Sequence, residues 1–143
     1  MKPRTRARAL ALQVLYEVDM ANHPPAEAFK ARLEEDSLSP DLAEFARQII
    51  FGVLPLTTSL DSAIAQYAPE WPFDQIAAID RNILRMACWE FAVSQDTPLK
   101  VAINEAVELA KQFGSDSASR FVNGVLGSLA DHQHEIKQAL QKA

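Results

Sequence analysis

The strongest constraint on the fold is that apolar residues recur every three or four positions along nearly the whole chain. This spacing places them on one face of an α-helix, and no stretch alternates apolar and polar residues in the manner of a β-strand. Prolines separate the periodic stretches and mark where helices begin or end. The sequence therefore predicts an all-α fold of about seven helices joined by short connections.

The positions of the prolines and of residues that can cap a helix set the expected helix boundaries. We expect helices over about residues 6–20, 25–33, 40–53, 58–67, 74–91, 98–113 and 117–129. Ser39 is the expected N-cap of the third helix, Asp74 that of the fifth, and Gly114 the end of the sixth. Pro55 divides a single domain (residues 1–143) into two packed subdomains, with three helices over about 1–55 and four over about 56–143. The polar tail from His132 is expected to fray.

Composition narrows the functional classes. The one cysteine, Cys88, excludes an internal disulfide and is expected in the core rather than as a nucleophile. We find no signal peptide and no apolar run long enough to span a membrane, which favours a cytoplasmic location. His132 and His134 would point to different faces of a helix, and no Gly-rich phosphate loop occurs. We expect no catalysis, no cofactor and no metal.

Basic residues are concentrated at the N-terminus of a chain whose formal net charge is −5. Lys2, Arg4, Arg6 and Arg8 all lie within the first eight positions. Such clustering is typical of a local phosphate-binding surface, and a solvated tail explains it equally well. The proline after Lys2 disfavours helix at that residue, and alternate arginines project to one side of an extended chain. We therefore expect an extended or loosely ordered arm that becomes ordered on a ligand.

The first helix carries two further candidates for contact with nucleic acid. Gln13 can form hydrogen bonds with a base edge, and Tyr16 can stack on an unpaired base, as in proteins that recognise single-stranded RNA. The alternative for Tyr16 is a half-buried aromatic residue of the core.

A second basic set flanks the connection before the last long helix. It comprises Lys111 and Arg120, with Ser117 at the expected helix start and Phe121 directly after Arg120. A serine there can offer its hydroxyl group to a phosphate or simply cap the helix. Phe121 is either a core residue or a second stacking platform.

Four segments, in this order, resemble the NusB family of bacterial transcription antitermination factors over nearly the whole chain. They are RARALALQVLY (6–16), IDRNILR (79–85), VAINEAVELAK (101–111) and RFVNGVL (120–126). The resemblance implies an all-helical fold of two packed subdomains. It also implies pairing with NusE, a ribosomal small-subunit protein, and binding of the single-stranded boxA element of nascent RNA. In the family this complex helps RNA polymerase to resist premature termination, notably on ribosomal RNA operons.

Applied to this chain, the resemblance assigns roles to individual residues. Its RNA surface would comprise Lys2, Arg4, Arg6, Arg8, Gln13, Tyr16, Lys111, Ser117, Arg120 and Phe121. The two basic sets would thus form one groove. Asp80 would face NusE, with a local ion pair to Arg81 or Arg85 as the alternative. Asn104, Glu105 and Asn123 lie in the strongest motifs, where we assign them only a role in positioning helices.

The chain departs from the family pattern at two positions. Ala9 stands where members often carry Glu, which removes an acidic residue and favours phosphate binding. Ala118 stands where they often carry Ser, so any serine contact with RNA falls to Ser117 or Ser119.

Two other functions fit part of these observations. NusB-like domains also form the N-terminal part of some ribosomal RNA cytosine methyltransferases, but those enzymes need a further α/β domain with an S-adenosylmethionine site and a nucleophilic Cys, which this chain lacks. A helical adaptor between proteins would make the arginines incidental. Amphipathic helices alone leave open whether the chain is a monomer or a homodimer.

Overall fold

A computed structural model describes residues 1–142, which form eight α-helices and no strands. Their bounds are α1 (Pro3–Ala21), α2 (Pro25–Glu35), α3 (Pro40–Val53), α4 (Thr57–Tyr67), α5 (Ala78–Trp89), α6 (Leu99–Phe113), α7 (Ala118–Ala130) and α8 (Gln133–Gln141). Two 3₁₀ turns, η1 (Leu54–Leu56) and η2 (Phe73–Gln75), and a π-helical turn, η3 (Glu90–Ser94), connect or extend them. The predicted all-α class is confirmed.

Local signals in the sequence explain most helix ends. Proline occupies the first position of α1, α2 and α3, where its missing N–H costs no hydrogen bond. The hydroxyl of Ser39 accepts a hydrogen bond from the backbone N–H of Leu42, as expected of an N-cap. The sixth helix ends at Gly114, as predicted, and the backbone N–H of Gly114 donates to the carbonyl of Ala110.

Two predicted boundaries are wrong. Asp74 lies in η2 and does not cap α5, which begins at Ala78. Ile76 is buried and has an extended backbone, so a helix cannot include this residue and α5 begins only after it. The tail does not fray over the described residues, because Ile136 and Leu140, four positions apart, are both buried and fix α8 against the core. Ala143 lies outside the described residues.

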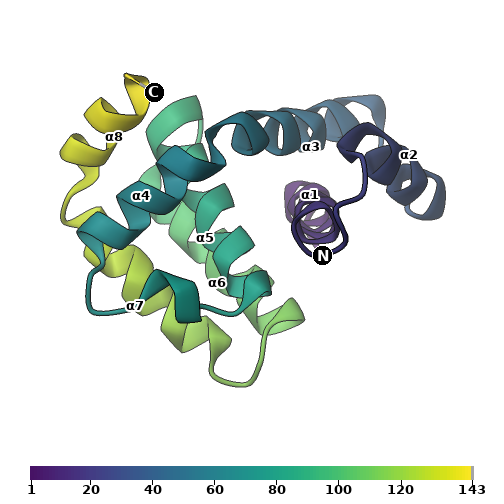
Figure 1. Ribbon diagram of the computed structural model, residues 1–143. Helices are drawn as coiled ribbons and strands as arrows, with labels where there is room; N and C mark the ends of the chain where they lie inside the picture. Colours follow the sequence, from purple (N-terminus) through teal and green to yellow (C-terminus); the bar gives the residue numbers. More distant parts are fainter. Residues whose placement is uncertain (143) are drawn as a thin grey trace.

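The helix α1 contacts α2, α3, α5 and α6, and α5 joins it to the second half of the chain through contacts with α4, α6 and α7. In Figure 1 the first three helices lie on one side, and α4 to α8 lie on the other. The helices α3 and α4 are nearly continuous through η1, and α6 pairs with α7 along their lengths. Because the buried apolar residues form one cluster across this boundary, the division into two subdomains near Pro55 stays a prediction.

The core accounts for the cysteine and for the most apolar stretch. Cys88 is buried, as predicted, and burial raises the pKa of its thiol to about 12. The stretch Pro40–Tyr67 meets a length and hydropathy criterion for a membrane span, with a mean hydropathy of 1.3. A core helix meets the same criterion, and here Ile49, Ile50 and Leu60 are fully buried among the other helices.

A buried ionic network, which we call the Arg8 node, joins α1 to the second half of the chain. Arg8 donates from Nη2 and Nε to the carboxylate of Glu90 at 2.7 and 2.9 Å, and from Nη1 to Glu105 at 3.1 Å. The hydroxyl of Thr97 donates to Glu90 at 2.9 Å, and that of Thr5 donates to Glu105 at 2.9 Å. The node therefore fastens the start of α1 to both η3 and α6.

A second network fastens the other end of α1. Arg81 on α5 donates to Asp19 in the last turns of α1 at 2.8 Å. Arg85, one turn later, bonds both oxygens of Asp61 on α4 at 2.7 and 2.8 Å and also reaches Asp19 at 3.4 Å. The two networks hold α1 at both ends, and they lie on elements far apart in the sequence.

Replacing Arg8 by Met should destabilise the fold strongly. Glu90 would stay buried without its main counter-charge, and breaking a buried pair in this way costs about 3–5 kcal/mol. The free energy of unfolding, measured by urea titration followed by circular dichroism, should fall by that amount. The control is Arg6→Met, which breaks an exposed pair with Asp36 and should cost below about 1 kcal/mol. Equal losses in the two variants would contradict the structural role of the node.

Candidate nucleic-acid interface

The start of α1 is ordered, so the expected extended arm is wrong. Lys2 alone is extended, and the helix begins at Pro3. The proline restricts the residue before it, whereas its own fixed φ suits the first position of a helix. Arg4 is therefore helical. Arg4 and Arg8 share one side of α1, where both guanidinium groups lie over the Phe45 ring, whereas Arg6 points away from that side.

Arg8 is not an exposed RNA contact, contrary to expectation. Only 2% of its surface is exposed, because helical spacing places it on the same buried stripe as Leu12 and Leu15. Its guanidinium is neutralised by Glu90 and Glu105 in the Arg8 node. Its contribution to any interface is to position the residues around it.

Arg6 points toward the connection between α2 and α3. Its guanidinium donates to the carboxylate of Asp36 and to the carbonyl oxygen of Ser37. Both side chains of this ion pair are largely exposed, so it is a weak and exchangeable contact.

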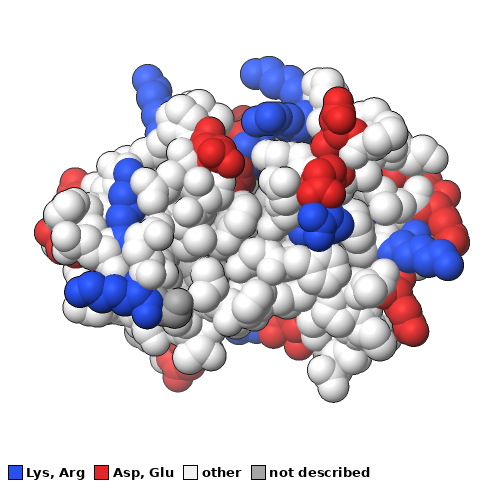
Figure 2. All heavy atoms as spheres, turned by 90° about the horizontal axis from the view of Figure 1, so that it is seen from above, with Lys and Arg blue, Asp and Glu red and all other residues white. Residues whose placement is uncertain are grey.

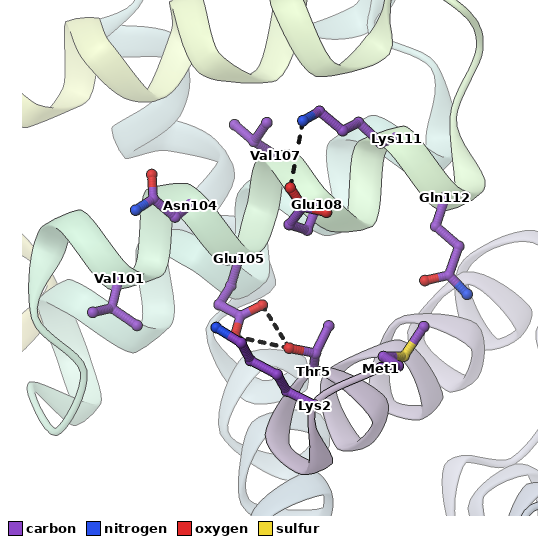
Figure 3. A pocket seen from close by; sticks show the side chains of 10 residues that line it. All are labelled: Met1, Lys2, Thr5, Val101, Asn104, Glu105, Val107, Glu108, Lys111 and Gln112. Carbon is purple, nitrogen blue, oxygen red and sulfur yellow. Dashed lines mark hydrogen bonds and ion pairs between the residues drawn. The ribbon is translucent and has the colours of Figure 1, made fainter.

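An open groove of about 890 Å³ separates the start of α1 from the exposed side of α6. We call it the α1–α6 groove. Lys2, from the first predicted basic set, and Lys111, from the second, both line it, with Glu105 and Glu108 between them (Figure 3). Thr5 and Glu105 line it where α1 meets α6, and their hydrogen bond holds the two helices together there. Lys111 itself lies 3.4 Å from Glu108, and both side chains of that pair are exposed.

Gln13 and Tyr16 lie further along α1, outside the lining of this groove. Gln13 is half-buried, and its side-chain oxygen accepts a hydrogen bond from Arg32 on α2. Tyr16 is 39% exposed, which places it at the surface instead of in the core. Its ring is thus accessible for stacking.

The rest of the second basic set surrounds a separate hollow of about 360 Å³, which we call the Trp71 hollow. Ser117 and Phe121 line it, and Phe121 packs edge-to-face on Trp71 with ring centroids 6.3 Å apart. The hydroxyl of Ser117 forms no capping hydrogen bond, so this side chain does not cap α7. Arg120 is exposed and forms no ion pair within residues 1–142. The single groove expected from the two basic sets is thus divided in two.

Asp80 also lines the Trp71 hollow, and its carboxylate has an oxygen without a hydrogen-bond partner. The alternative ion pair is absent, since Arg81 and Arg85 bind Asp19 and Asp61 instead. The residue is only 7% exposed, and this burial raises the pKa of its carboxyl group.

Charge is distributed in small groups over the surface. Figure 2 shows one face on which basic and acidic side chains lie side by side around a broad uncharged area. Because the net charge of the protein is −5, any binding of phosphate groups depends on local groups of cations and not on the charge of the whole surface.

Sequence reasoning missed several residues of these sites. Trp71 lies in the connection between α4 and η2, and its position beside Phe121 on α7 depends on packing that no local pattern shows. Glu90 lies in a helical stretch with no motif, 82 positions from Arg8. Glu105 was expected to position helices, and its bonds to Thr5 and Arg8 agree with that role.

Comparison with known proteins identifies close relatives. Residues 5–131 match the model of the NusB family. The transcription antitermination protein NusB of Roseiflexus castenholzii is 48% identical over 134 residues, which cover 92% of this chain and 94% of that protein. The NusB structure of T. maritima is 29% identical with a TM-score of 0.83 and covers 98% of each chain. A chain in the crystal structure of antitermination factors NusB and NusE with dsRNA is 28% identical with a TM-score of 0.80, covering 97% of this chain and 98% of that one.

Replacing Asp80 by Asn should stabilise the protein at neutral pH. Burial in the folded state raises the pKa of the Asp80 carboxyl group, so the folded protein binds this proton more tightly than the unfolded chain does. As the pH rises, the buried carboxyl group ionises, and the free energy of unfolding decreases. The neutral amide avoids that cost. The gain in thermal midpoint should be largest near pH 7 and should vanish well below the ordinary Asp pKa of about 3.9, where the carboxyl group is protonated in both states. Asp74→Asn, at an exposed neighbouring position, is the control, and a pH-independent gain at Asp80 would contradict the explanation.

Proposed function

Because this chain belongs to the NusB family, we propose that it is a non-catalytic transcription antitermination factor that binds single-stranded boxA-type RNA together with NusE. The observation that supports this most is the α1–α6 groove. It collects cations from two helices, Lys2 and Lys111, in a protein with a net negative charge. Proteins bind phosphates through such local groups of cations.

The groove offers the kinds of contact that a single strand requires. Lys2 and Lys111 neutralise phosphates, and Arg4 lies directly beyond Lys2 on α1. The exposed amide side chains of Asn104 and Gln112 can form hydrogen bonds with base edges. Glu108 forms a weak, exposed ion pair with Lys111. An RNA phosphate must therefore displace the Glu108 carboxylate in order to bind Lys111.

The remaining predicted residues extend this surface. We assign RNA contacts to Arg6, Gln13 and Tyr16 along α1, where Arg6 exchanges Asp36 for a phosphate. We also assign them to Ser117, Arg120 and Phe121 at the start of α7, and we assign Asp80 to the contact with NusE. Arg8 acts through the node that positions the first turn of α1.

The comparisons favour antitermination over the methyltransferase alternative. The matched relative from Roseiflexus castenholzii is covered over 94% of its own length, which leaves no room for a methyltransferase domain in that protein. We therefore propose action in the cytoplasm, as part of an RNA polymerase antitermination complex on ribosomal RNA operons. The solved complex contains double-stranded RNA, so the preference for a single strand is a separate point to test.

Removing both groove lysines should weaken RNA binding without unfolding the protein. In the Lys2→Ala/Lys111→Ala variant the slope of log affinity against log salt should become shallower by about 1.4, because each phosphate contact to a single strand contributes about 0.7. Binding of labelled boxA RNA, alone and with NusE, is measured by fluorescence anisotropy at several salt concentrations. The matched control is Lys30→Ala/Lys142→Ala, which removes two exposed lysines elsewhere. Equal weakening in the two double variants, or a salt-independent affinity, would contradict the proposal.

Glu108→Gln should have the opposite effect. It frees Lys111 from its ion pair and removes a negative charge beside the RNA, so affinity should rise. Glu135→Gln on α8 removes an equally exposed carboxylate outside the groove and should leave affinity unchanged. A duplex of the same sequence serves as competitor, and equal affinity for duplex and single strand would contradict the single-strand preference.

A further inference from the structure

The α1–α6 groove does not end at α1. A hollow of about 390 Å³ shares Lys2 and Glu105 with the groove and continues past Arg4. From there, a small hollow of about 90 Å³ and a larger one of about 370 Å³ lead across η3 onto α3. Each hollow shares lining residues with the next, so the hollows follow one another along the surface from α6 to α3. We call the last two hollows the α3 extension.

Trp89 lies between the two hollows of the α3 extension and lines both. Its indole ring rests on the backbone of α3 at Gly52, where a Cβ atom would stand 2.3 Å from the ring. Only glycine permits this contact. The ring is thereby held in place while part of its surface remains exposed in both hollows, which is the arrangement that a stacking platform requires.

A cation stands on each side of Trp89. Arg4 is exposed, and its guanidinium lies 4.7 Å from the centre of the Phe45 ring, a cation–π contact that restricts the side chain. Arg47 is exposed on α3 and bonds both oxygens of Glu44 at 2.8 and 2.7 Å. Two acidic groups thus face this surface, Glu44 and the exposed Asp96, whereas the nearby Glu90 is already neutralised within the Arg8 node.

We propose that the RNA strand continues from the α1–α6 groove over Arg4 onto α3, with a base stacked on Trp89 and a phosphate bound by Arg47. The proposal rests on the proposed function, since it extends the same RNA site. Arg4 and Arg47 flank the half-buried ring of Trp89, and such a sequence of cation, ring and cation suits a single nucleic-acid strand, whose phosphates and bases alternate in the same way. The hollows also adjoin the α1–α6 groove through shared lining residues, so one strand can reach both.

The fluorescence of Trp89 tests the stacking contact directly. The chain has two tryptophans, so Trp71→Phe leaves Trp89 as the only indole and keeps an aromatic ring beside Phe121. This variant is titrated with single-stranded RNA of about 6 and about 12 nucleotides, lengths within the usual range for one binding site. We expect the longer RNA to quench Trp89 emission at the same midpoint as its binding by anisotropy. Binding of the longer RNA without any change in Trp89 emission would overturn the proposal, and so would a change caused by NusE alone.

Variants on α3 test the phosphate contact. Arg47→Ala should make the salt slope for the longer RNA shallower by about 0.7 and leave the slope for the shorter RNA unchanged. Glu44→Gln frees Arg47 and should tighten binding of the longer RNA only. Lys30→Ala, on the exposed side of α2, is the matched control.

The outcomes separate this proposal from the proposed function. If replacing Lys2 and Lys111 weakens RNA binding while the α3 variants bind both RNAs like the unmodified protein, the proposed RNA contact on α3 is wrong and the proposed contact in the α1–α6 groove is retained. If no variant in either region changes binding, both fail.

Discussion

The burial of Arg8 is the interaction on which the rest of this structure depends. A guanidinium in the core requires counter-charges, and Glu90 and Glu105 supply them from η3 and α6. The node therefore fixes the start of α1 relative to the second half of the chain. Because Thr5 bonds the same Glu105, the first turn of α1 is held against α6, and the α1–α6 groove follows from that placement. The second network, in which Arg81 and Arg85 bind Asp19, fixes the opposite end of α1 in the same way.

This arrangement divides the N-terminal cations between structure and recognition. Arg8 serves the fold, whereas Lys2 and Arg4 line the surface proposed for RNA. Three of the exposed cations assigned to that surface are paired with exposed acidic residues: Arg6 with Asp36, Lys111 with Glu108 and Arg47 with Glu44. A phosphate must displace these carboxylates, which lowers attraction for polyanions in general and favours ligands that fit the whole recess. A net negative charge and a local RNA surface are compatible for this reason.

Much of the fold could be predicted from local chemistry. Prolines at positions 25 and 40 marked the first residues of helices, and apolar spacing identified the buried faces. The failures have a common cause, which is that burial by distant partners overrides local pattern. Arg8 was expected at the surface because arginine is polar, although its spacing from Leu12 and Leu15 already placed it on the buried stripe. The last helix has only two inward residues, Ile136 and Leu140, too few to reveal its packing. Of the residues predicted for one RNA surface, Lys2 and Lys111 line the same groove, whereas the separation of Ser117 and Phe121 from them depends on helix packing.

The most direct test of the account is a map of backbone amide chemical shifts by NMR as boxA RNA is added. The account holds that one strand contacts the first turn of α1 and the outer face of α6 at the same time. It therefore predicts that the amides of residues 2, 4 and 5 and of residues 104–112 shift together, with one midpoint that moves to higher RNA concentration as salt is raised. Shifts confined to one of these two segments, or located instead on α2 and α8, would contradict it.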